Sequence, residues 1–378
     1  MTAKSRSPHR NSACLAVESL EDRALLSMLP TTAAAAHVAE SQLAPIVTQL
    51  PGNGPQNFST IPSNGDVNPY GVAFVPTGFK GGGSLAPGDM LVSNFNNGTS
   101  NFQGTGVTIS LFAPGSTTPQ TFFQGNGLGL TTGLAVLKSG FVVVGNLPST
   151  DGTANTGATG SILILNSSGQ VVKTIASPIY IQGPWDLTVN DNGNSPQIFV
   201  ANVEDGTVSR IDLKIKNQSI NVQRMTQVAS GYGHRPDAAA FFVGPTGLAY
   251  NPKTDVLFVN STLDNLVYAV HRAGHVKNVQ GPGKILFSDQ THLHGPLGLA
   301  LAPNGDLLIA NGDVTNADPN QPSEVVEITQ KGQFVGQFST FAQTAAPFGI
   351  GVGVSGNAVT VGVVNDDNNT INVYHVMA

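Results

Sequence analysis

Cysteine is almost absent from this chain: its 378 residues include one, Cys14, near the N-terminus. Residues 55–378 therefore hold no disulfide, no thiolate metal site and no cysteine nucleophile. Charged side chains are also few, at 11% of the residues, and the formal net charge is −6. A chain without a basic surplus offers no electrostatic footprint for phosphates, so nucleic-acid binding is not expected.

Several other signatures are missing. No stretch reaches the roughly 18 consecutive apolar residues of a membrane span. The chain has no Gly-x-Ser-x-Gly elbow, no His-Glu-x-x-His motif and no Gly-Lys-Ser phosphate loop. These absences argue against a membrane-spanning protein, an elbow-type serine hydrolase, a zinc protease of that motif and a P-loop nucleotide enzyme.

What the chain does have is a repeat that occurs six times. Each copy opens with a turn and a short apolar segment, and a second apolar segment then ends in Asn. The openings lie at residues 69–73, 131–135, 184–188, 245–249, 296–300 and 347–351. The second segments end at Asn94, Asn146, Asn202, Asn260, Asn311 and Asn365. A period of 51 to 62 residues between openings is typical of a repeat architecture.

The short apolar segments, separated by Gly, Pro, Asn and Asp, predict strands joined by tight turns. In the fifth copy the expected strands are 299–302, 307–310, 325–328 and 334–338. Four antiparallel strands in each copy predict the blade of a β-propeller. The expected fold is therefore all-β: a six-bladed β-propeller of four-stranded antiparallel blades.

The two ends of the repeat region predict how the ring closes. The sixth copy has only three strand segments, which would leave its blade with a raw edge. Residues 55–59 resemble 119–123, the fourth strand of the first copy. We therefore expect residues 55–61 to complete the last blade, with residues 1–54 as a leader and 55–378 as the propeller.

Residues 294–311 read His-Gly-Pro-Leu-Gly-Leu-Ala-Leu-Ala-Pro-Asn-Gly-Asp-Leu-Leu-Ile-Ala-Asn and resemble an NHL repeat. The resemblance covers about residues 55–378, but the Asn-x-Arg that often follows the second strand of such repeats is missing. NHL-like propellers include protein-binding and RNA-binding modules, lactonases and lyases. The resemblance thus implies a fold and not one activity.

Residues 1–54 do not fit the repeat. A basic start is followed by a short apolar stretch, and residues 17–27 resemble the Leu-Glu-Asp-Arg leader of some bacterial exported proteins. A standard signal peptide needs a longer continuous apolar stretch than the one found before Arg23. Export is the expected outcome, and a disordered tail on a cytosolic protein is the alternative. A monomer is expected.

Two features of the repeat bear on function. The six terminal Asn residues should meet at one end of the channel, where they either form a polar collar for a ligand, water or cation, or cap their strands. Five copies have Gly at the third opening position, and the third copy has Asp186, after the only tryptophan, Trp185. A carboxylate there would line the channel mouth. It would either take part in ligand binding or make a hydrogen bond that only stabilises the fold.

Polar residues in the blade connections are further candidates. His292 and His294 could share a metal if a third ligand joined them, or His294 could bond a neighbouring turn. His234 and Arg235 should face the same rim. The Asp-rich and Asn-rich runs 190–194 and 365–369 lack EF-hand spacing and are interpreted as turns.

Two functions follow. The first is an exported binding propeller whose top face takes a protein, polymer or small molecule, without an enzymatic role. The alternative, implied by the resemblance, is a metal-assisted lactonase or lyase at the channel mouth, although Tyr70 and Gly71 stand where such enzymes carry a Glu. No metal ligand set is assigned; no cofactor is required, and the channel leaves room for a divalent cation. The candidate ligand-binding residues are Trp185, Asp186, Asn202, His234, Arg235, Asn260, His294 and Asn311.

Overall fold

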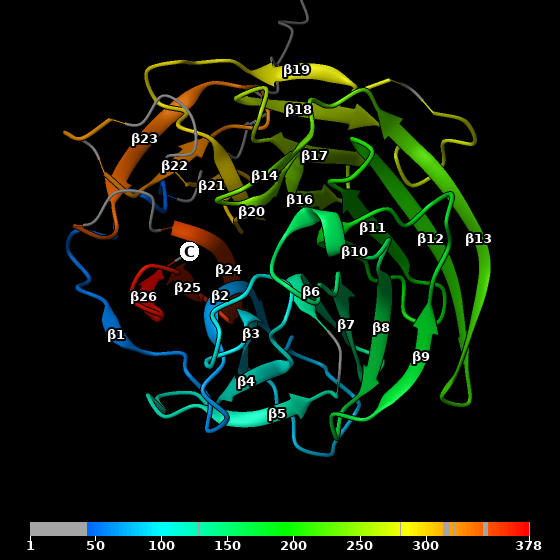
Figure 1. Ribbon diagram of the computed structural model, residues 1–378. Helices are drawn as coiled ribbons and strands as arrows, with labels where there is room; N and C mark the ends of the chain where they lie inside the picture. Colours follow the sequence, from blue (N-terminus) through cyan, green and yellow to red (C-terminus); the bar gives the residue numbers. More distant parts are fainter. Residues whose placement is uncertain are drawn as a thin grey trace, which may run out of the picture. The chain divides into compact units, whose positions relative to one another are not determined.

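The computed structural model describes residues 44–126, 129–279, 281–312, 318–320, 322–342 and 347–377. Six four-stranded antiparallel sheets stand around a central axis, as the repeat predicts (Figure 1). Their first strands form a closed ring in which each contacts the next: β2, β6, β10, β16, β20, β24 and again β2. The predicted six-bladed β-propeller is confirmed.

The first three blades follow one another along the chain. Blade 1 contains β2 (Val67–Phe74), β3 (Met90–Asn96), β4 (Thr108–Phe112) and β5 (Gln120–Gln124). Blade 2 contains β6 (Leu130–Leu137), β7 (Phe141–Asn146), β8 (Ser161–Asn166) and β9 (Val171–Ile175). Blade 3 contains β10 (Pro184–Asn190), β11 (Gln197–Asn202), β12 (Thr207–Lys216) and β13 (Ser219–Ser230).

The other three blades complete the ring. Blade 4 contains β16 (Pro245–Asn251), β17 (Val256–Ser261), β18 (Leu266–His271) and β19 (Lys284–Phe287). Blade 5 contains β20 (Pro296–Leu301), β21 (Leu307–Asn311), β22 (Glu324–Ile328) and β23 (Phe334–Ser339). Blade 6 contains β24 (Pro347–Ser355), β25 (Ala358–Asn365), β26 (Thr370–Met377) and, from the N-terminal side, β1 (Gln56–Ser59).

The predicted closure of the ring is present. Strand β1 pairs antiparallel with β26, with Gln56 opposite Val373 and Ser59 opposite Thr370. The pairing joins segments more than 300 residues apart and covers the raw edge that three C-terminal strands alone would leave. In a ring without disulfides, this pairing and the packing between blades hold the two ends together.

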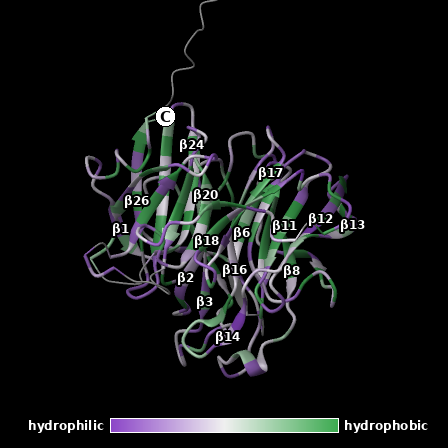
Figure 2. Cartoon of the chain, turned by 90° about the horizontal axis from the view of Figure 1, so that it is seen from above, coloured by the Kyte–Doolittle hydropathy of each residue, from purple (hydrophilic) through white to green (hydrophobic). Residues whose placement is uncertain are grey.

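The core lies between neighbouring blades. Middle strands are apolar on both faces because each blade is covered on both sides; the residues of β7, for example, are all buried. One apolar cluster joins blades 2 and 3 through Val143, Ile162 and Ile198, and a similar cluster lies at each of the other blade junctions. The hydrophobic strand centres are visible in Figure 2.

Part of the segment assigned to the leader packs on the propeller. Ile46, Val47 and Leu50 are buried in the cluster between blades 5 and 6. The buried Glu327 carboxylate accepts the backbone N–H groups of Ile46 and Val47, at 3.1 and 2.7 Å. The domain boundary at residue 54 stays a prediction, and the Leu-Glu-Asp-Arg segment lies outside the described residues.

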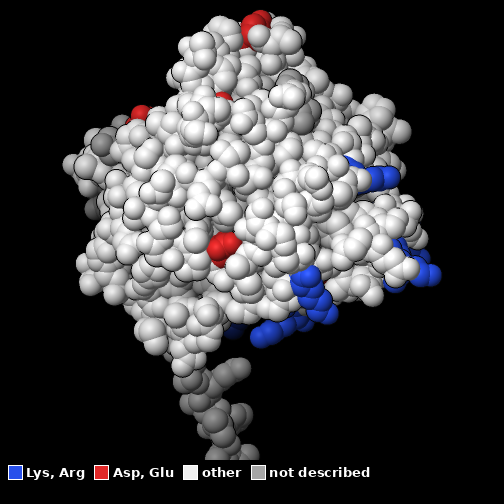
Figure 3. All heavy atoms as spheres, turned by 90° about the horizontal axis from the view of Figure 1, so that it is seen from below, with Lys and Arg blue, Asp and Glu red and all other residues white. Residues whose placement is uncertain are grey.

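Two elements were not expected. The blade 3–4 connection forms a hairpin of β14 (Arg235–Asp237) and β15 (Phe241–Val243), and the blade 2 insertion holds the 3-10 helix η1 (Ala154–Thr156). In the part of the chain that the structure describes, no helix is long and apolar enough to cross a membrane. Figure 3 shows one side of the molecule, where charged side chains are sparse and the Lys and Arg gather toward one edge.

Candidate functional site

The blade connections and the second-to-third-strand turns lie at the same end of the ring, called the top face here. The register places them there: Pro69 pairs with Asn94, Pro296 with Asn311 and Pro347 with Asn365, so each blade opens beside its terminal Asn. Hairpin β14–β15 stands at this end, and the C-terminus lies at the opposite end (Figure 2).

An aromatic plug closes the channel at the top face. It consists of Tyr70, Phe95, Trp185 and Phe348, which meet edge to face. Ring centroids lie 6.1 Å apart for Tyr70 and Trp185, 5.9 Å for Tyr70 and Phe348, and 5.4 Å for Phe95 and Trp185. Edge-to-face contacts at these distances are favourable and fix the rings in place. Trp185 is 4% exposed, so the plug seals the axis.

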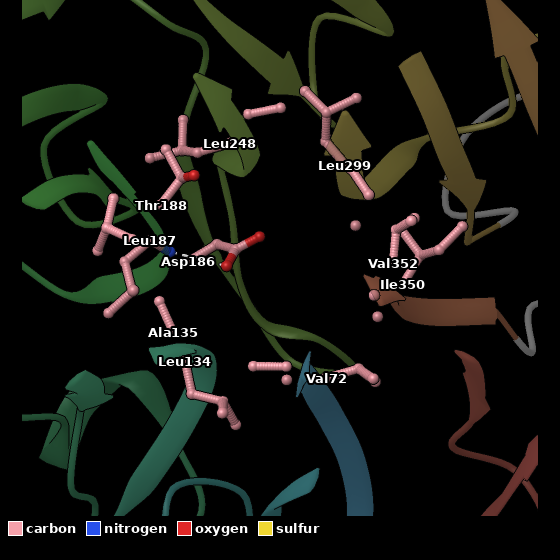
Figure 4. A pocket seen from close by; sticks show the side chains of 18 of the residues that line it. Val72, Leu134, Ala135, Asp186, Leu187, Thr188, Leu248, Leu299, Ile350 and Val352 are labelled. Carbon is pink, nitrogen blue, oxygen red and sulfur yellow. Dashed lines mark hydrogen bonds between the residues drawn. The ribbon is translucent and has the colours of Figure 1, made fainter. Parts of the chain in front are cut away.

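Asp186 lies directly below this plug. Five blades have a glycine at the same level. In four of them a built Cβ would clash with the next blade; at Gly349 it would meet the Tyr70 carbonyl oxygen. Asp186 carries the one side chain at this level among the described residues, and its carboxyl points into the channel (Figure 4). Its Oδ1 accepts the Leu187 backbone N–H at 2.7 Å. Burial raises the pKa of Asp186 to about 7, although backbone N–H groups of Leu187 and Leu248 act to lower it.

The terminal Asn residues form a buried collar between the blades and reach neither the plug nor Asp186. Asn260 donates to the carbonyl oxygens of Leu297 and Gly298 in the next blade, at 3.0 and 3.3 Å. Asn202 donates to the Tyr180 carbonyl and accepts the Gln182 N–H. Both Asn side chains are fully buried. These contacts support the strand-capping interpretation.

The candidate imidazoles do not converge on one site. His294 is buried, and its Nε2 lies 3.2 Å from Oε1 of the fully buried Glu324, to which Asn311 donates. His292 instead pairs with Asp289 through Nδ1, at 2.6 Å, and stacks on a ring of blade 5. His234 is exposed on the top face, where its Nδ1 lies 3.0 Å from a backbone carbonyl.

A pocket of about 470 Å³ opens on the top face above the plug. Tyr70, Phe95, Trp185 and Phe348 form its floor, and its rim is polar; the rim residues are Asn68, Gln103, Arg235, Asp237, Asp366 and Asp367. This top pocket thus collects Trp185 and Arg235 from the predicted set. The other six predicted residues line no part of it.

The rim of the top pocket is mainly acidic. Arg235 is paired with Asp237 at 3.0 Å, which leaves Asp367 as the unbalanced charge at neutral pH. Burial, and then the charge of Asp367, raise the pKa of Asp366 to about 8. Oδ1 of Asp366 is buried and has no hydrogen-bond partner among the described residues. Asp366 and Asp367 lie in the run interpreted as a turn, and the turn is there: Asn368 N–H donates to the Asn365 side chain.

The residues at the channel mouth do not fit a metal ion. Asp186 would be one ligand, but the side-chain oxygens of Asn202 and Asn311 already accept the backbone N–H groups of Gln182 and His294. The Asn260 oxygen has no hydrogen-bond partner among the described residues, so it is the one amide oxygen of the three that is not engaged. Among the described residues, no three His, Cys, Asp or Glu side chains are grouped so that they could hold a metal.

No protein-family profile matches the chain, and no curated protein matches its sequence significantly. Three solved structures share its fold at low identity. An oxidoreductase described as a glucose dehydrogenase, from Thermus thermophilus, is 15% identical with a TM-score of 0.51, covering 85% of this chain and 100% of its own. A gluconolactonase from Xanthomonas campestris is 12% identical with a TM-score of 0.53, covering 85% and 90%. A luciferin-regenerating enzyme is 12% identical with a TM-score of 0.50, covering 86% and 96%. These likenesses show the propeller fold alone.

Proposed function

We propose that this protein is a binding propeller that takes its ligand in the top pocket without a metal. The observation that carries the proposal is the combination, in one pocket of about 470 Å³, of an aromatic floor with a polar rim. Concave sites with large apolar contact area and a few placed polar groups are the usual form of a ligand site. The rim comes from separate connections of the ring, so the fold brings together residues far apart in sequence.

The chemistry of the pocket favours a ligand with several hydrogen-bond donors on an apolar skeleton. The Asp367 carboxylate accepts hydrogen bonds, the Asp366 carboxyl group, mostly protonated at neutral pH, can accept and donate, and the rings of Trp185 and Phe348 offer apolar surface. A carbohydrate, or a hydroxyl-rich or amine-bearing side chain of a protein partner, meets both requirements. An anion does not, because the unbalanced rim charge is negative.

A blocking substitution tests the proposal. Ala239 is exposed and lines the top pocket, whereas its neighbour Ala238 is exposed and does not. We expect Ala239→Arg to fill the pocket and Ala238→Arg to leave it open. Mono- and oligosaccharides and short peptides would be screened by thermal shift against the wild type. Compounds that stabilise wild type and A238R but not A239R support the proposal. Compounds that stabilise all three equally, or none at all, would count against it.

We also propose that the protein acts outside the cytoplasm as a monomer. The leader resemblance and the low charge support export, and the cysteine-free propeller needs no oxidising compartment to fold. Cell fractionation of a bacterium expressing the full chain with a C-terminal tag would test this. Tagged protein found only in the cytoplasmic fraction would contradict it.

The second candidate function is the metal-assisted lactonase or lyase. It is favoured by one observation: Asp186 lines an axial cavity with a pKa of about 7, near the optimum for a general acid or base at neutral pH. Gluconolactone hydrolysis would be measured with added calcium or zinc and with chelator, for wild type and Asp186→Asn. Activity that needs both the metal and Asp186 would favour this candidate over the binding propeller.

A further inference from the structure

The axial channel holds a second cavity, of about 270 Å³, below the aromatic plug. Inner strands of all six blades line it, mostly with apolar side chains such as Val72, Leu134 and Leu248 (Figure 4). The Asp186 carboxyl points into this space from one side. The cavity therefore has apolar walls and a single acidic group.

The space exists because of the glycines at the level of Asp186. In blades 1, 5 and 6 the cavity wall there is Gly71, Gly298 and Gly349, which carry no side chain. The neighbouring strands are already in close contact at this level, since a Cβ at Gly298 would lie 2.7 Å from the Phe348 carbonyl oxygen. The ring geometry thus leaves room beside the carboxyl.

The closed end of the cavity also carries a poorly satisfied polar group. The hydroxyl of Tyr70 is buried, with the residue 2% exposed; the Trp185 indole is its hydrogen-bonding neighbour, but the two do not form a bond of normal geometry. Burial raises the pKa of Tyr70, and the negative charge of the nearby Asp186 raises it further. A bound donor or acceptor would give this hydroxyl a well-placed hydrogen bond.

The opposite end of the cavity is its entrance. The plug buries the top, where Leu297 is 5% exposed. Toward the turns between first and second strands, Leu301, Val352 and Thr188 are half-buried and border the cavity. A ligand would therefore enter from the face opposite the top pocket, on the other side of the plug.

We propose that this channel cavity binds a small organic cation of the alkylammonium class. The ammonium group would donate to the Asp186 carboxylate and the Tyr70 hydroxyl, and the alkyl part would lie along the apolar walls. Tyr70 and Tyr250 are the other titratable residues that line the cavity, and no basic side chain lines it among the described residues. A cation therefore meets no competing charge. The inference is independent of the function proposed for the top pocket.

The proposal fixes a dependence on pH. The carboxylate is the binding form, and the pKa of Asp186 is about 7 in the empty cavity. Apparent affinity scales with the fraction of molecules in the competent form, so it should rise about 10-fold between pH 6 and pH 8. An alkylammonium ion stays charged throughout, because its own pKa is near that of lysine, about 10.

The experiment uses the full chain with n-butylammonium and, as its uncharged counterpart, 1-butanol. Isothermal titration calorimetry at pH 6 and pH 8 would be run on the wild type, Asp186→Asn and Asp186→Gly. Asp186→Gly introduces the residue that the other five blades have at this position, so it should fold even if Asp186→Asn does not. Asp191→Asn is the control, since Asp191 lies in a turn at the entrance end but lines no part of the cavity.

We expect butylammonium to bind the wild type and D191N about 10-fold more tightly at pH 8 than at pH 6. We expect D186N and D186G to bind it at least 10-fold more weakly at pH 8, with no pH dependence, and butanol to show none in any variant. Equal binding of butylammonium by wild type and D186N would overturn the proposal. An equal loss of affinity in D191N and D186N would also overturn the proposal. The absence of any butylammonium binding to the wild type would overturn it as well, because the cavity would then hold only water.

Discussion

Asp186, half-buried in the wall of the channel cavity, makes a specific prediction about stability and pH. In the folded chain its pKa is raised from 3.8 to about 7, mainly by burial. Between these values the folded state binds a proton that the unfolded state has lost. The contribution of this group to stability is therefore complete below pH 4 and is lost as the pH rises toward 7. Asp186→Asn has no proton to lose, so it should remove this dependence.

The size of the effect follows from the pKa. Each pH unit in the window corresponds to about 1.4 kcal/mol, so the whole rise corresponds to about 4 kcal/mol. Other groups of raised pKa, such as Glu204 and Asp366, titrate in the wild type and in the variant alike. Their contributions cancel in the difference between the two proteins. The wild type should thus lose about 1.4 kcal/mol relative to D186N for each unit between pH 5 and pH 6.5.

Urea unfolding at a series of pH values, followed by tryptophan fluorescence, measures this difference. Trp185 is the single tryptophan and is buried in the plug, so its emission reports the opening of the ring. The difference in free energy of unfolding between wild type and D186N would be plotted against pH. A flat plot between pH 5 and pH 7 would refute the reasoning, because it would mean that Asp186 is solvated and titrates normally.

Three more predictions concern the packing of the ring. Gly349→Ala should lower the free energy of unfolding by about 3 kcal/mol or more, because its Cβ would meet a backbone carbonyl. Gly54→Ala is the control: open space surrounds Gly54, so the change should be less than about 0.5 kcal/mol. Urea unfolding of both variants measures the difference. Asn260→Ala should cost about 1–3 kcal/mol in the same assay, because it removes two buried hydrogen bonds to carbonyl oxygens of the next blade. An unchanged midpoint would make the collar dispensable. Glu327→Ala should release residues 44–50 from the propeller, so that limited proteolysis cuts them while the ring stays folded. Equal resistance to the protease in wild type and variant would show that the Glu327 carboxylate does not hold this segment.

The fold could be predicted from the sequence because the same pattern of strands and turns occurs in six copies. Local signals agreed in the fifth copy: the four expected strands appear as β20, β21, β22 and β23, with ends that differ by three residues at most. Closure by β1 was also predictable, since an incomplete last copy needs a partner. The hairpin β14–β15 was not, because its strands are three residues long and carry no alternating pattern.

The candidate site was predictable only where a residue broke the repeat. Trp185 and Asp186 stood out on that ground, and the structure places them at the plug and in the channel. The terminal Asn residues also stood out, yet Asn202 and Asn260 bond backbone groups between the blades and line neither pocket. Asp366 stood in a run that was interpreted only as a turn, and Gln103 gave no signal, because the top pocket forms where loops of unlike sequence meet in space.

The central claim is that this propeller recognises its ligand without a metal at the channel mouth. Elemental analysis of the purified full chain, combined with its thermal midpoint before and after chelator treatment, tests the claim most directly. We predict no stoichiometric calcium or zinc and a midpoint that chelator leaves unchanged. One equivalent of either metal, with a lower midpoint after its removal, would contradict the claim and favour the metal-assisted lactonase or lyase.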